Sequence, residues 1–533
     1  MHIAPGDSEK MSQHEGWTGR TASALQAAMR LTNEAFAEHL GIAVRTVAGW
    51  HQKPDLKPKS EMQQLLDTAH NQADAAVKAR FDALTAEPKL DLPDGAAADA
   101  ELRLSSDPNI VAALDWLDQH AGWEPGTARR DVAARLVRLD VRALQDRGVR
   151  RGRVNQRDTA RALAEYYGAT TTGHGRYAAR FSSTTRASTT VFTHPDWLDL
   201  DCPLMPAHDR LKLSTVTPND HQTMDEASAG HAAQRLAEAL ALGNRVVNMP
   251  LYRLLDVGVR KHALAGSVGV ANFVGYVVTM DLLEGELVDA LTTDRPIRPG
   301  ALPLRDAYLP DLPSVLDVSD RMCAGGALAL TAIARPADPF RGEADYLLLV
   351  QERSGHVINA ARRLAVIPKG FHQPLTDYRA DAQIGATLRR EMEEELFGRD
   401  DIDNTVGDQR HADPMHPTRL SEPMRWLLAE PGRLRMECTG FGLNLVSGNF
   451  EFASLIVIED EQFWTEFGGQ VRANWEAANL RQFSSLDTDS LEELTNDVAW
   501  SNEGLFALLQ GLRRLQQIGG NRVNLPTIEW ETE

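Results

Sequence analysis

Residues 390–395, Arg-Glu-Met-Glu-Glu-Glu, concentrate negative charge in a short stretch and constrain what must surround it. In an α-helix, Glu391, Glu394 and Glu395 stand at i, i+3 and i+4, so their side chains share one face. Neighbouring carboxylates repel one another unless a cation lies between them. Mg²⁺ takes oxygen ligands and is commonly shared between carboxylates and substrate phosphates. The spacing therefore predicts a Mg²⁺ site, and the alternative is the solvated acidic face that glutamate-rich helices usually form.

The segments before this helix predict two strands and a turn. Residues 344–353 and 364–370 are runs of mostly apolar residues, typical of strands, and the second run ends at Gly370, where a turn is expected. Leu388 and Met392 lie on a different face of the helix from the glutamates and can anchor it in a core. The pattern therefore favours a sheet with a packed acidic helix.

This order of elements resembles the Nudix hydrolase family, whose signature is Gly-x5-Glu-x7-Arg-Glu-U-x-Glu-Glu-x-Gly-U, with U an aliphatic residue. The positions that match are Gly370, Arg390, Glu391, Met392, Glu394 and Glu395. The sequence departs from the signature at three points. The interval from the glycine to the arginine is six residues longer, Ala382 stands where the signature has glutamate, and Gly398 comes one residue late. The resemblance implies the fold more strongly than the activity.

The resemblance implies a Nudix-like α/β/α sandwich over residues 313–466 that binds a nucleotide-derived or phosphorylated ligand. It assigns catalysis to Arg390 and the three glutamates, which would also hold Mg²⁺. Glu451 alternates onto the strand face opposite Phe450 and Phe452 and is a further candidate metal ligand. The candidate ligand-binding residues are Arg353, Lys369 and Gly370, because arginine and lysine suit phosphate oxygens.

Length and composition bound the class of protein. A chain of 533 residues predicts about three or four domains, and 43% hydrophobic with 25% charged residues is ordinary for a globular protein. No run is apolar enough to span a membrane, and the first residues lack a signal peptide. Cys202, Cys323 and Cys438 form neither a disulfide framework nor a zinc spacing, which favours a cytoplasmic location. The formal charge of −19 restricts any contact with DNA to a local surface.

Residues 33–50 predict two short helices joined by a tight turn. The apolar residues spaced to enter one small core are Phe36, Leu40, Ile42, Val47 and Trp50. Ala37 is small where the helices must cross, and Gly41 supplies the positive φ of the turn. Thr32 can cap the first helix. The pattern matches a helix-turn-helix, whose second helix enters the major groove of DNA; the alternative is a two-helix hairpin within a bundle.

The residues expected to face DNA are Ala43, Val44, Arg45, Thr46, Gly49, Lys53 and Lys57. Arg45 is expected to contact a base edge, since arginine pairs bidentately with guanine, and the lysines are expected to contact phosphates. Residues 21–85 resemble the Xre-type helix-turn-helix heads of actinobacterial transcriptional regulators. The resemblance implies double-stranded DNA as a partner.

The sequence divides into segments of different character. They are a flexible tail (1–20), the helix-turn-helix domain (21–85), a linker (86–108), an Arg-rich helical segment (109–170), a middle helical or mixed domain (171–312), the Nudix-like domain (313–466) and a C-terminal helical extension (467–533). Residues 231–291 are expected to form a run of apolar helices. The extension is expected to pack against the sheet.

The Arg-rich segment leaves two interpretations open. Between Arg129 and Arg161, eleven arginines oppose four aspartates, a net of +7. Such a surface either neutralises DNA phosphates or pairs with acidic residues of this chain or of a partner subunit.

Three functions fit these features, on a multidomain fold with an all-α head and an α+β body. The leading one is a DNA-binding transcriptional regulator, a homodimer whose heads contact two half-sites and whose body senses a nucleotide-like ligand. The second is a Mg²⁺-dependent hydrolase of nucleoside diphosphate derivatives, with the head as a localisation device. The third is an assembly protein that uses the Nudix-like fold as an interaction surface.

Overall fold

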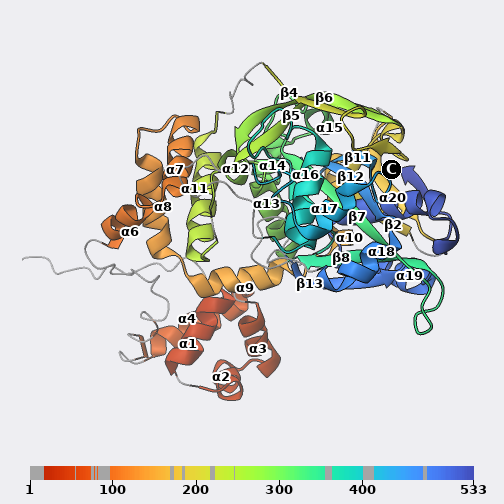
Figure 1. Cartoon of the computed structure of the whole chain (residues 1–533). Coiled ribbons are helices and arrows are strands. Elements are labelled where there is room, and N and C mark those ends of the chain that lie inside the picture. The colour runs from red at the N-terminus through yellow and green to blue at the C-terminus, as the bar shows by residue number, and fades with distance from the viewer. Residues whose placement is uncertain are drawn as a thin grey trace, which may run out of the picture. The chain divides into compact units, whose positions relative to one another are not determined.

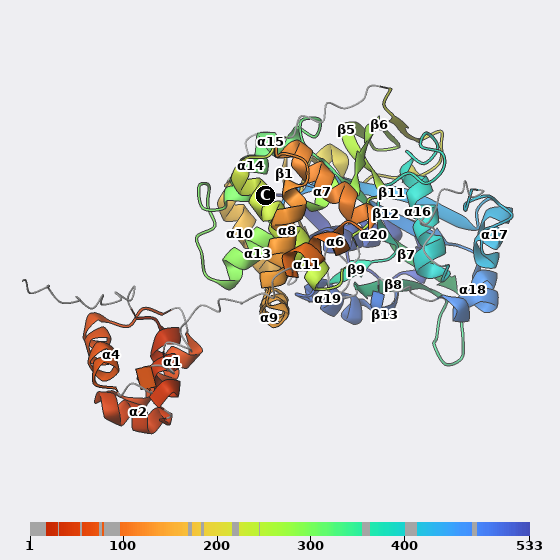
Figure 2. The same cartoon turned by 90° about the vertical axis from the view of Figure 1, so that its left-hand side faces the viewer.

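The computed structural model describes residues 17–29, 31–53, 56–73, 77–78, 81, 96–168, 173–182, 186–215, 223–244, 246–353, 363–399, 413–471 and 477–533. The chain divides into two units, Met1–Pro93 and Asp94–Glu533, which we call the head and the body (Figures 1 and 2). Most of the expected tail (1–16) and the first part of the expected linker (86–95) lie outside the described residues. No helix in the described ranges is long and apolar enough to cross a membrane.

The head is a small all-α unit with a hydrophobic core of its own. The helices of the head whose bounds are described are α1 (Gly19–Met29), α2 (Asn33–Leu40), α3 (Val44–Gln52) and α4 (Ser60–Gln72). Its buried core includes Trp17, Leu25, Phe36, Leu40, Val47, Trp50 and Leu66. Helices α1, α2 and α3 are shorter than an isolated helix that is stable in water, so packing around this core stabilises them.

The turn between α2 and α3 has the geometry that the sequence predicts. The Thr32 side chain accepts a hydrogen bond from the Ala35 N–H and caps α2. Gly41 ends α2 with a φ of 67°, and the Ile42 N–H donates to the Ala37 carbonyl at 2.9 Å. The capping and the left-handed glycine close the helix end, so both of these predictions are confirmed.

The body is built on a large mixed sheet of order β13-β8-β7-β12-β11-β2-β1-β14, in which β10 pairs with β7, β9 with β8 and β3 with β11. The strands are β1 (Gly175–Arg180), β2 (Arg186–Thr193), β3 (Cys202–Pro203), β7 (Gly325–Arg335), β8 (Asp345–Arg353), β9 (Leu364–Val366), β10 (Lys369–Phe371), β11 (Leu434–Asn444), β12 (Phe450–Ile458), β13 (Ala477–Ser484) and β14 (Glu529–Thr532). A second sheet of order β4-β6-β5 contains β4 (Asp209–Leu213), β5 (Pro250–Arg260) and β6 (Ala263–Asn272).

Helices surround these sheets. They are α6 (Ala96–Leu104), α7 (Pro108–His120), α8 (Thr127–Arg138), α9 (Val141–Arg151), α10 (Gln156–Tyr167), α11 (Glu226–Ala241), α12 (Phe273–Val277), α13 (Leu282–Thr292), α14 (Pro303–Tyr308), α15 (Leu312–Leu316), α16 (Ile384–Glu391), α17 (Glu422–Ala429), α18 (Glu461–Phe467), α19 (Thr488–Asn496) and α20 (Asn502–Ile518). Short helical turns are η1 (Pro195–Trp197), η2 (Met392–Leu396), η3 (Gly468–Gln470) and η4 (Gly520–Arg522).

The large sheet separates two hydrophobic cores. Along β7, Ala327 and Ala329 face the core that includes Leu388 of α16, whereas Leu328 and Leu330 face the core formed with α20. This alternation is the two-residue period of a strand buried on both faces. The body is therefore a mixed α/β unit whose sheet carries helices on both sides, which agrees with the expected α+β class.

Three segments expected to be separate domains share this one sheet. The middle segment supplies β1, β2 and β3, the Nudix-like segment supplies β7 to β12, and the C-terminal segment supplies β13 and β14. The boundaries expected at 312/313 and 466/467 thus lie inside a single unit. The physical reason is that strand backbone groups need partners on both sides, and here these partners come from distant parts of the chain. The C-terminal helix α20 packs against the sheet, as expected.

Two further expectations differ from the structure. Residues 96–104, expected to be part of a linker, form α6, because Ala100 and Leu104 lie four residues apart and are buried beside α8. Figures 1 and 2 both show α6, α8 and α11 side by side. The expected run of helices at 231–291 is interrupted by β5 and β6, which pair antiparallel. From Asp256 to Arg260 exposure alternates along β5, which is the period of a strand and not of a helix.

Two buried arginines hold the loop between β11 and β12. Arg305 is fully buried and donates to the carbonyls of Leu445 and Val446 at 2.5 and 2.6 Å. Arg321 donates to the carbonyl of Gly448 at 2.5 Å. These bonds satisfy loop carbonyls that the strand ladder leaves unpaired.

Replacing Arg305 with methionine tests this role. The substitution keeps an unbranched apolar stem but removes the guanidinium, which leaves two buried carbonyls without donors, at about 1–3 kcal/mol each. We expect a clear decrease in the urea midpoint of the body. The matched control is Arg298→Met, because Arg298 is exposed and surface changes are within about 0.5 kcal/mol. Equal midpoints for the two variants would contradict the role assigned to Arg305.

Candidate functional site

The outer surface of α3 is the first candidate site. Val47 and Trp50 are buried in the head, whereas Ala43, Val44 and Arg45 are exposed at the start of the helix. The exposed fraction of Val44 is 42%, which is high for a large apolar residue. The core residues therefore fix α3 so that its first turn points outward.

The other residues predicted to contact DNA lie along the same segment. Lys53 and Lys57 are exposed, and Thr46 and Gly49 are partly buried. A side-chain Cβ built at Gly49 would meet no atom within 4 Å. A glycine inside a helix costs about 1 kcal/mol relative to alanine. No described atom would clash with a side chain at position 49, so packing within the head does not explain this glycine.

The acidic helix does not continue as a regular α-helix through its glutamates. Helix α16 ends at Glu391 and runs into η2, a single π-helical turn. A π turn is wider than an α turn and changes the angular spacing of its side chains. The angular spacing expected for Glu391, Glu394 and Glu395 on a regular α-helix is therefore changed through this turn, although Glu391 and Glu395 both lie against β10.

Glu391 and Arg390 form a buried pair that packs on Gly370. The Arg390 guanidinium lies 2.7 Å from a carboxylate oxygen of Glu391 and donates to the carbonyls of Phe371 and Gln373. A Cβ at Gly370 would lie 2.1 Å from the carboxyl carbon of Glu391. The motif residues Gly370, Arg390 and Glu391 therefore meet in space, where they fasten β10 to α16.

The neighbouring glutamates also have internal partners. Glu395 accepts the Lys369 N–H at 2.7 Å. Glu393 is fully buried, pairs with Arg399 at 2.8 Å and accepts hydrogen bonds from Ser421. Within the described residues no three His, Cys, Asp or Glu side chains come together as a metal site. Glu391 and Glu395, which the sequence assigns to Mg²⁺, thus anchor β10.

Glu451 lies on the other side of the sheet. Phe450 and Phe452 belong to the core on the α16 side, and Glu451 faces α20, so the predicted alternation is confirmed. Burial raises the pKa of Glu451 to about 8, and the nearby Glu503 carboxylate contributes to this rise. The sheet separates Glu451 from Glu391, so the structure does not bring the four proposed metal ligands together.

The proposed ligand-binding residues are dispersed in the same way. Arg353 is buried at the end of β8. Lys369 points to the α20 side, where its ammonium lies 2.5 Å from Glu503. Gly370 faces Glu391 on the opposite side. Of the three, Lys369 lies beside a cavity.

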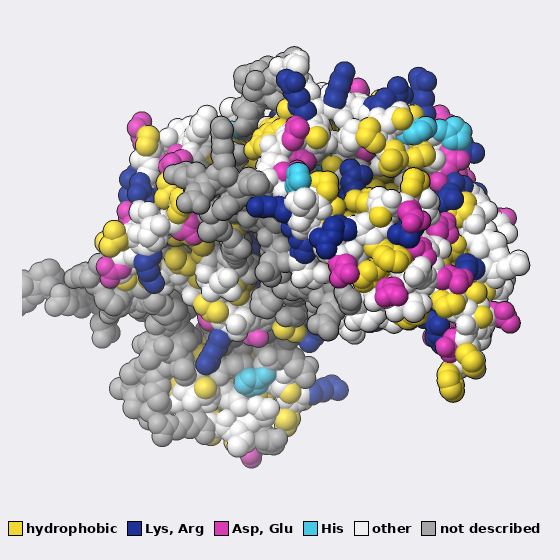
Figure 3. All heavy atoms as spheres, in the orientation of Figure 1, with side chains coloured by type: hydrophobic (Ala, Val, Ile, Leu, Met, Phe, Trp, Pro, Cys, Tyr) yellow, Lys and Arg dark blue, Asp and Glu magenta, His cyan; other side chains and the backbone are white. Residues whose placement is uncertain are grey.

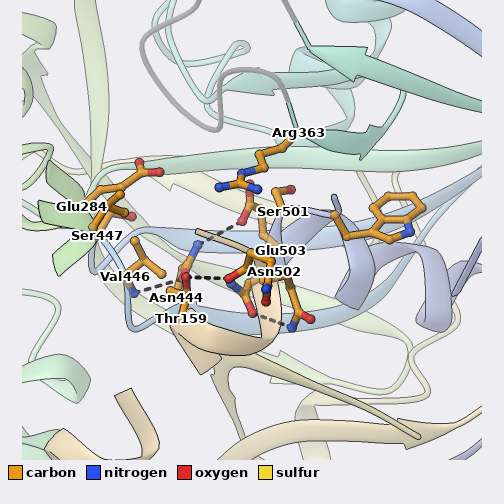
Figure 4. Close-up of a pocket in the computed structure, with 13 residues that line it drawn as sticks. Thr159, Glu284, Arg363, Asn444, Val446, Ser447, Ser501, Asn502 and Glu503 are labelled. Atoms are coloured by element: carbon orange, nitrogen blue, oxygen red, sulfur yellow. Dashed lines mark hydrogen bonds between the residues drawn. The ribbon is translucent and has the colours of Figure 1, made fainter. Parts of the chain in front are cut away.

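This cavity has a volume of about 50 Å³ and lies at the start of α20 (Figure 4). Its walls come from α10, α13, the β11–β12 loop, the start of α20 and Arg363. The residues that line it are Asn155, Gln156, Thr159, Glu284, Val288, Arg363, Asn444, Val446, Ser447, Trp500, Ser501, Asn502 and Glu503. No local motif predicts this site, because these residues come from segments far apart in the chain.

The lining is polar and charged. Figure 4 shows Glu284 beside Ser447, with Arg363 and Glu503 across from them. Asn444 donates to Glu503 at 3.2 Å. The Ser447 hydroxyl, whose residue is 2% exposed, has no hydrogen-bond partner among the described residues. Burial raises the pKa of Glu284 to about 7, with further contributions from Asp281 and Glu503.

The volume decides what the cavity can hold. A water needs about 10–15 Å³ of such space, so a few waters or one small polar group fit. Sites for drug-sized ligands have volumes of about 300–1,000 Å³. The cavity therefore suits one polar group of a ligand and would have to widen for a whole nucleotide.

Substitution of Gly370 tests the packing of the motif. In Gly370→Ala the new methyl group displaces the Glu391 carboxylate from Arg390, and overpacking typically costs about 1–3 kcal/mol. Adding Glu391→Ala should remove the clash, so a double-mutant cycle should show coupling of about 0.5–3 kcal/mol. Gly469→Ala is the control, because a Cβ there meets no atom within 4 Å. Additive effects at 370 and 391 would contradict the contact.

The pH dependence of stability tests the environment of Glu284, which lines the cavity. Its pKa is raised in the folded protein, so its contribution to stability is present at low pH and is lost as the pH rises from about 4.5 towards 7. We expect Glu284→Gln to gain in unfolding free energy relative to wild type over this window, by at most about 1.4 kcal/mol per pH unit. The exposed control Glu343→Gln should follow the wild-type curve. A flat difference between Glu284→Gln and wild type would rule out the raised pKa.

The two resemblances rest on their own motif residues, 33–50 in the head and 370–398 in the body. The head motif forms paired helices with an exposed outer face, and the body motif forms the junction of β10 with α16. Neither protein-family models nor curated proteins give a match to this chain.

Proposed function

We propose that this chain is a DNA-binding transcriptional regulator, with α3 as the helix that enters the major groove. The observation that carries the proposal is the outward first turn of α3 on a head with its own core. Val47 and Trp50 hold the helix from inside, and Arg45 projects outside. Arginine at this place can pair with guanine, and the exposed Val44 can contact a thymine methyl group.

Local charge supports the same surface. Residues 43–59 contain four basic residues and one aspartate, a formal charge of +3 within a chain of −19. Lys53, Lys57 and Lys59 are exposed. Phosphate contacts supply most of the affinity of a protein for DNA and fix its register on the duplex. Because the protein as a whole is acidic, we expect DNA to bind only at this segment of the head and at other basic surfaces.

A homodimer is part of the proposal. One such head buries little surface on DNA, and helix-turn-helix proteins commonly reach specific affinity with two heads on half-sites one helical turn apart. The body, as the larger unit, is the part proposed to associate.

The body is proposed to sense a phosphorylated or nucleotide-derived ligand. The polar cavity at the start of α20 supports this role, because Arg363 supplies positive charge in the lining that contains the buried Ser447 hydroxyl, and the Lys369 ammonium lies next to it in an ion pair with Glu503. A ligand alters DNA binding only if it binds one arrangement of the protein more tightly than the other. Mg²⁺ enters this proposal as an ion shared between a ligand's phosphates and one or two carboxylates.

The hydrolase alternative has less support. It needs Glu391, Glu394 and Glu395 around one metal ion, and two of these carboxylates bind Arg390 and the Lys369 backbone instead. A ligand sensor does not need these three carboxylates to surround one metal ion.

Two substitutions in the head test DNA recognition. Arg45→Ala should cost about 1–3 kcal/mol of discrimination at one base position, because it removes a bidentate contact with guanine. Lys59→Ala should weaken binding uniformly across sequences and lower the salt slope by about 1. Both can be measured by titrating labelled duplexes selected from the protein's own upstream DNA at several salt concentrations. An Arg45→Ala protein with unchanged sequence preference would refute the assignment of α3.

A further inference from the structure

Some arginines of helix α9 face the rest of the body and others face outward. The arginines that face the body form ion pairs. Arg151 forms two contacts with Asp289 of α13, at 2.5 and 2.6 Å. Arg147 pairs with Glu238 of α11, and Leu144 is buried beside them. These contacts fix α9 on the body.

The outer surface has a different character. Arg138, Arg142, Arg150 and Arg153 are exposed, and their side chains make no hydrogen bond or ion pair with any described residue. Arg142 and Arg150 are eight residues apart on α9, on the side of the helix turned away from Leu144. Arg138 lies just before α9 and Arg153 just after it. We call these four arginines the α9 face.

We propose that the α9 face binds the phosphate backbone of duplex DNA, as a second contact beside the head. The inference rests on the proposed function, which it extends from the head to the body. Of the two interpretations of the Arg-rich segment, pairing within the chain accounts for Arg147 and Arg151 and leaves the α9 face without a partner among the described residues. Arginine suits phosphate because its planar fork can donate two hydrogen bonds at once.

The firm attachment of α9 favours such a contact. A helix held by two ion pairs loses little freedom when it binds, so the entropic cost falls mainly on the arginine side chains. With a rise of about 1.5 Å per residue, Arg142 and Arg150 are roughly 12 Å apart along the helix. One DNA strand carries a phosphate about every 3.4 Å of the duplex axis, so the two arginines can contact different phosphates of one strand.

The number of residues between Phe81 and α6 limits the distance over which the head and the α9 face can bind one duplex. The first residue of α6 follows the last described residue of the head by fifteen positions, and a chain of that length spans at most roughly 50 Å. Helix α6 packs on α8, which leads directly into α9. The α9 face is therefore part of the helical layer with which the body begins.

Two aspartates oppose this charge. Asp140 caps α9 by accepting hydrogen bonds from the Arg142 and Ala143 N–H groups. Asp146 is exposed, four residues from both Arg142 and Arg150. Four arginines and two aspartates leave the surface a net formal charge of +2. Removal of Asp146 should strengthen DNA binding because its carboxylate repels phosphate.

The test uses full-length protein and a labelled duplex of random sequence, titrated between about 50 and 200 mM salt, a range over which phosphate contacts change the affinity strongly. The variant Arg142→Gln/Arg150→Gln/Arg153→Gln should lower the slope of log affinity against log salt by about 0.9 for each phosphate that is no longer bound. Asp146→Asn should raise the affinity. Circular dichroism checks that each variant keeps its fold.

The matched control removes equal charge from another exposed basic surface of the body. Arg210→Gln/Lys212→Gln/Arg260→Gln lies on the β4-β6-β5 sheet, where Figure 3 shows basic side chains gathered along one edge. Its salt slope should remain that of wild type. If the salt slope decreased equally in the control and in the α9 variant, overall charge alone would explain the effect, and the inference would be overturned.

The head variant separates this inference from the proposed function. If Arg45→Ala/Lys53→Ala leaves binding unchanged while the α9 variant weakens it, the α9 face stands and the role of the head fails. If only the head variant weakens binding, the α9 inference fails and the role of the head stands. An α9 variant that keeps DNA affinity but becomes monomeric by light scattering would assign the face to an acidic protein surface and also overturn the inference.

Discussion

The parallel pairing of β7 with β12 is the constraint on which the body depends. These strands run side by side from Gly325 and Phe450 to Ile333 and Ile458. Parallel neighbours cannot be joined by a tight turn, so the chain between them must leave the sheet and return. That excursion contains β8, β9, β10, α16 and β11, and it brings Glu391 and Glu395 to the same side of β10. Because both faces of β7 and β12 are buried, the sheet then requires α20 to cover the other side.

The buried charges of the body follow from this arrangement. Glu391 and Glu395 meet Arg390 and the β10 backbone on one face, and Glu503 meets Lys369 on the other. A buried charge without a partner is strongly destabilising, so each of these carboxylates has a donor close by. Glu451 follows the alternative route, since its raised pKa favours the neutral form. Carboxylates near a strand end can therefore hold a sheet together as readily as they can hold a metal.

Local features of the structure could be predicted from the sequence, and distant ones could not. Thr32, Gly41 and the apolar spacing around Trp50 act within a few residues, so the paired helices followed from pattern alone. Gly370, Arg390 and Glu391 belong to one motif, but the π turn that follows Glu391 has no sequence pattern. The cavity could not be anticipated, because its walls come from α10, α13, a hairpin loop and α20. The same holds for Cys202 and Cys438, which are far apart in the sequence and stand opposite each other on β3 and β11.

The pairing of β14 with β1 has a consequence for biosynthesis. Residues 529–532 lie against residues 177–180, and Glu531 also binds Arg186, 345 residues earlier. During translation β1 and β2 therefore emerge long before the strand that covers their edge, and an uncovered strand edge is prone to pair with other chains. The core of the head lies within its own short segment, so the head can fold while the body is still being made. In a nascent chain the head is therefore folded first. The exposed edge of β1 must then be kept from pairing with other chains until residue 532 has left the ribosome.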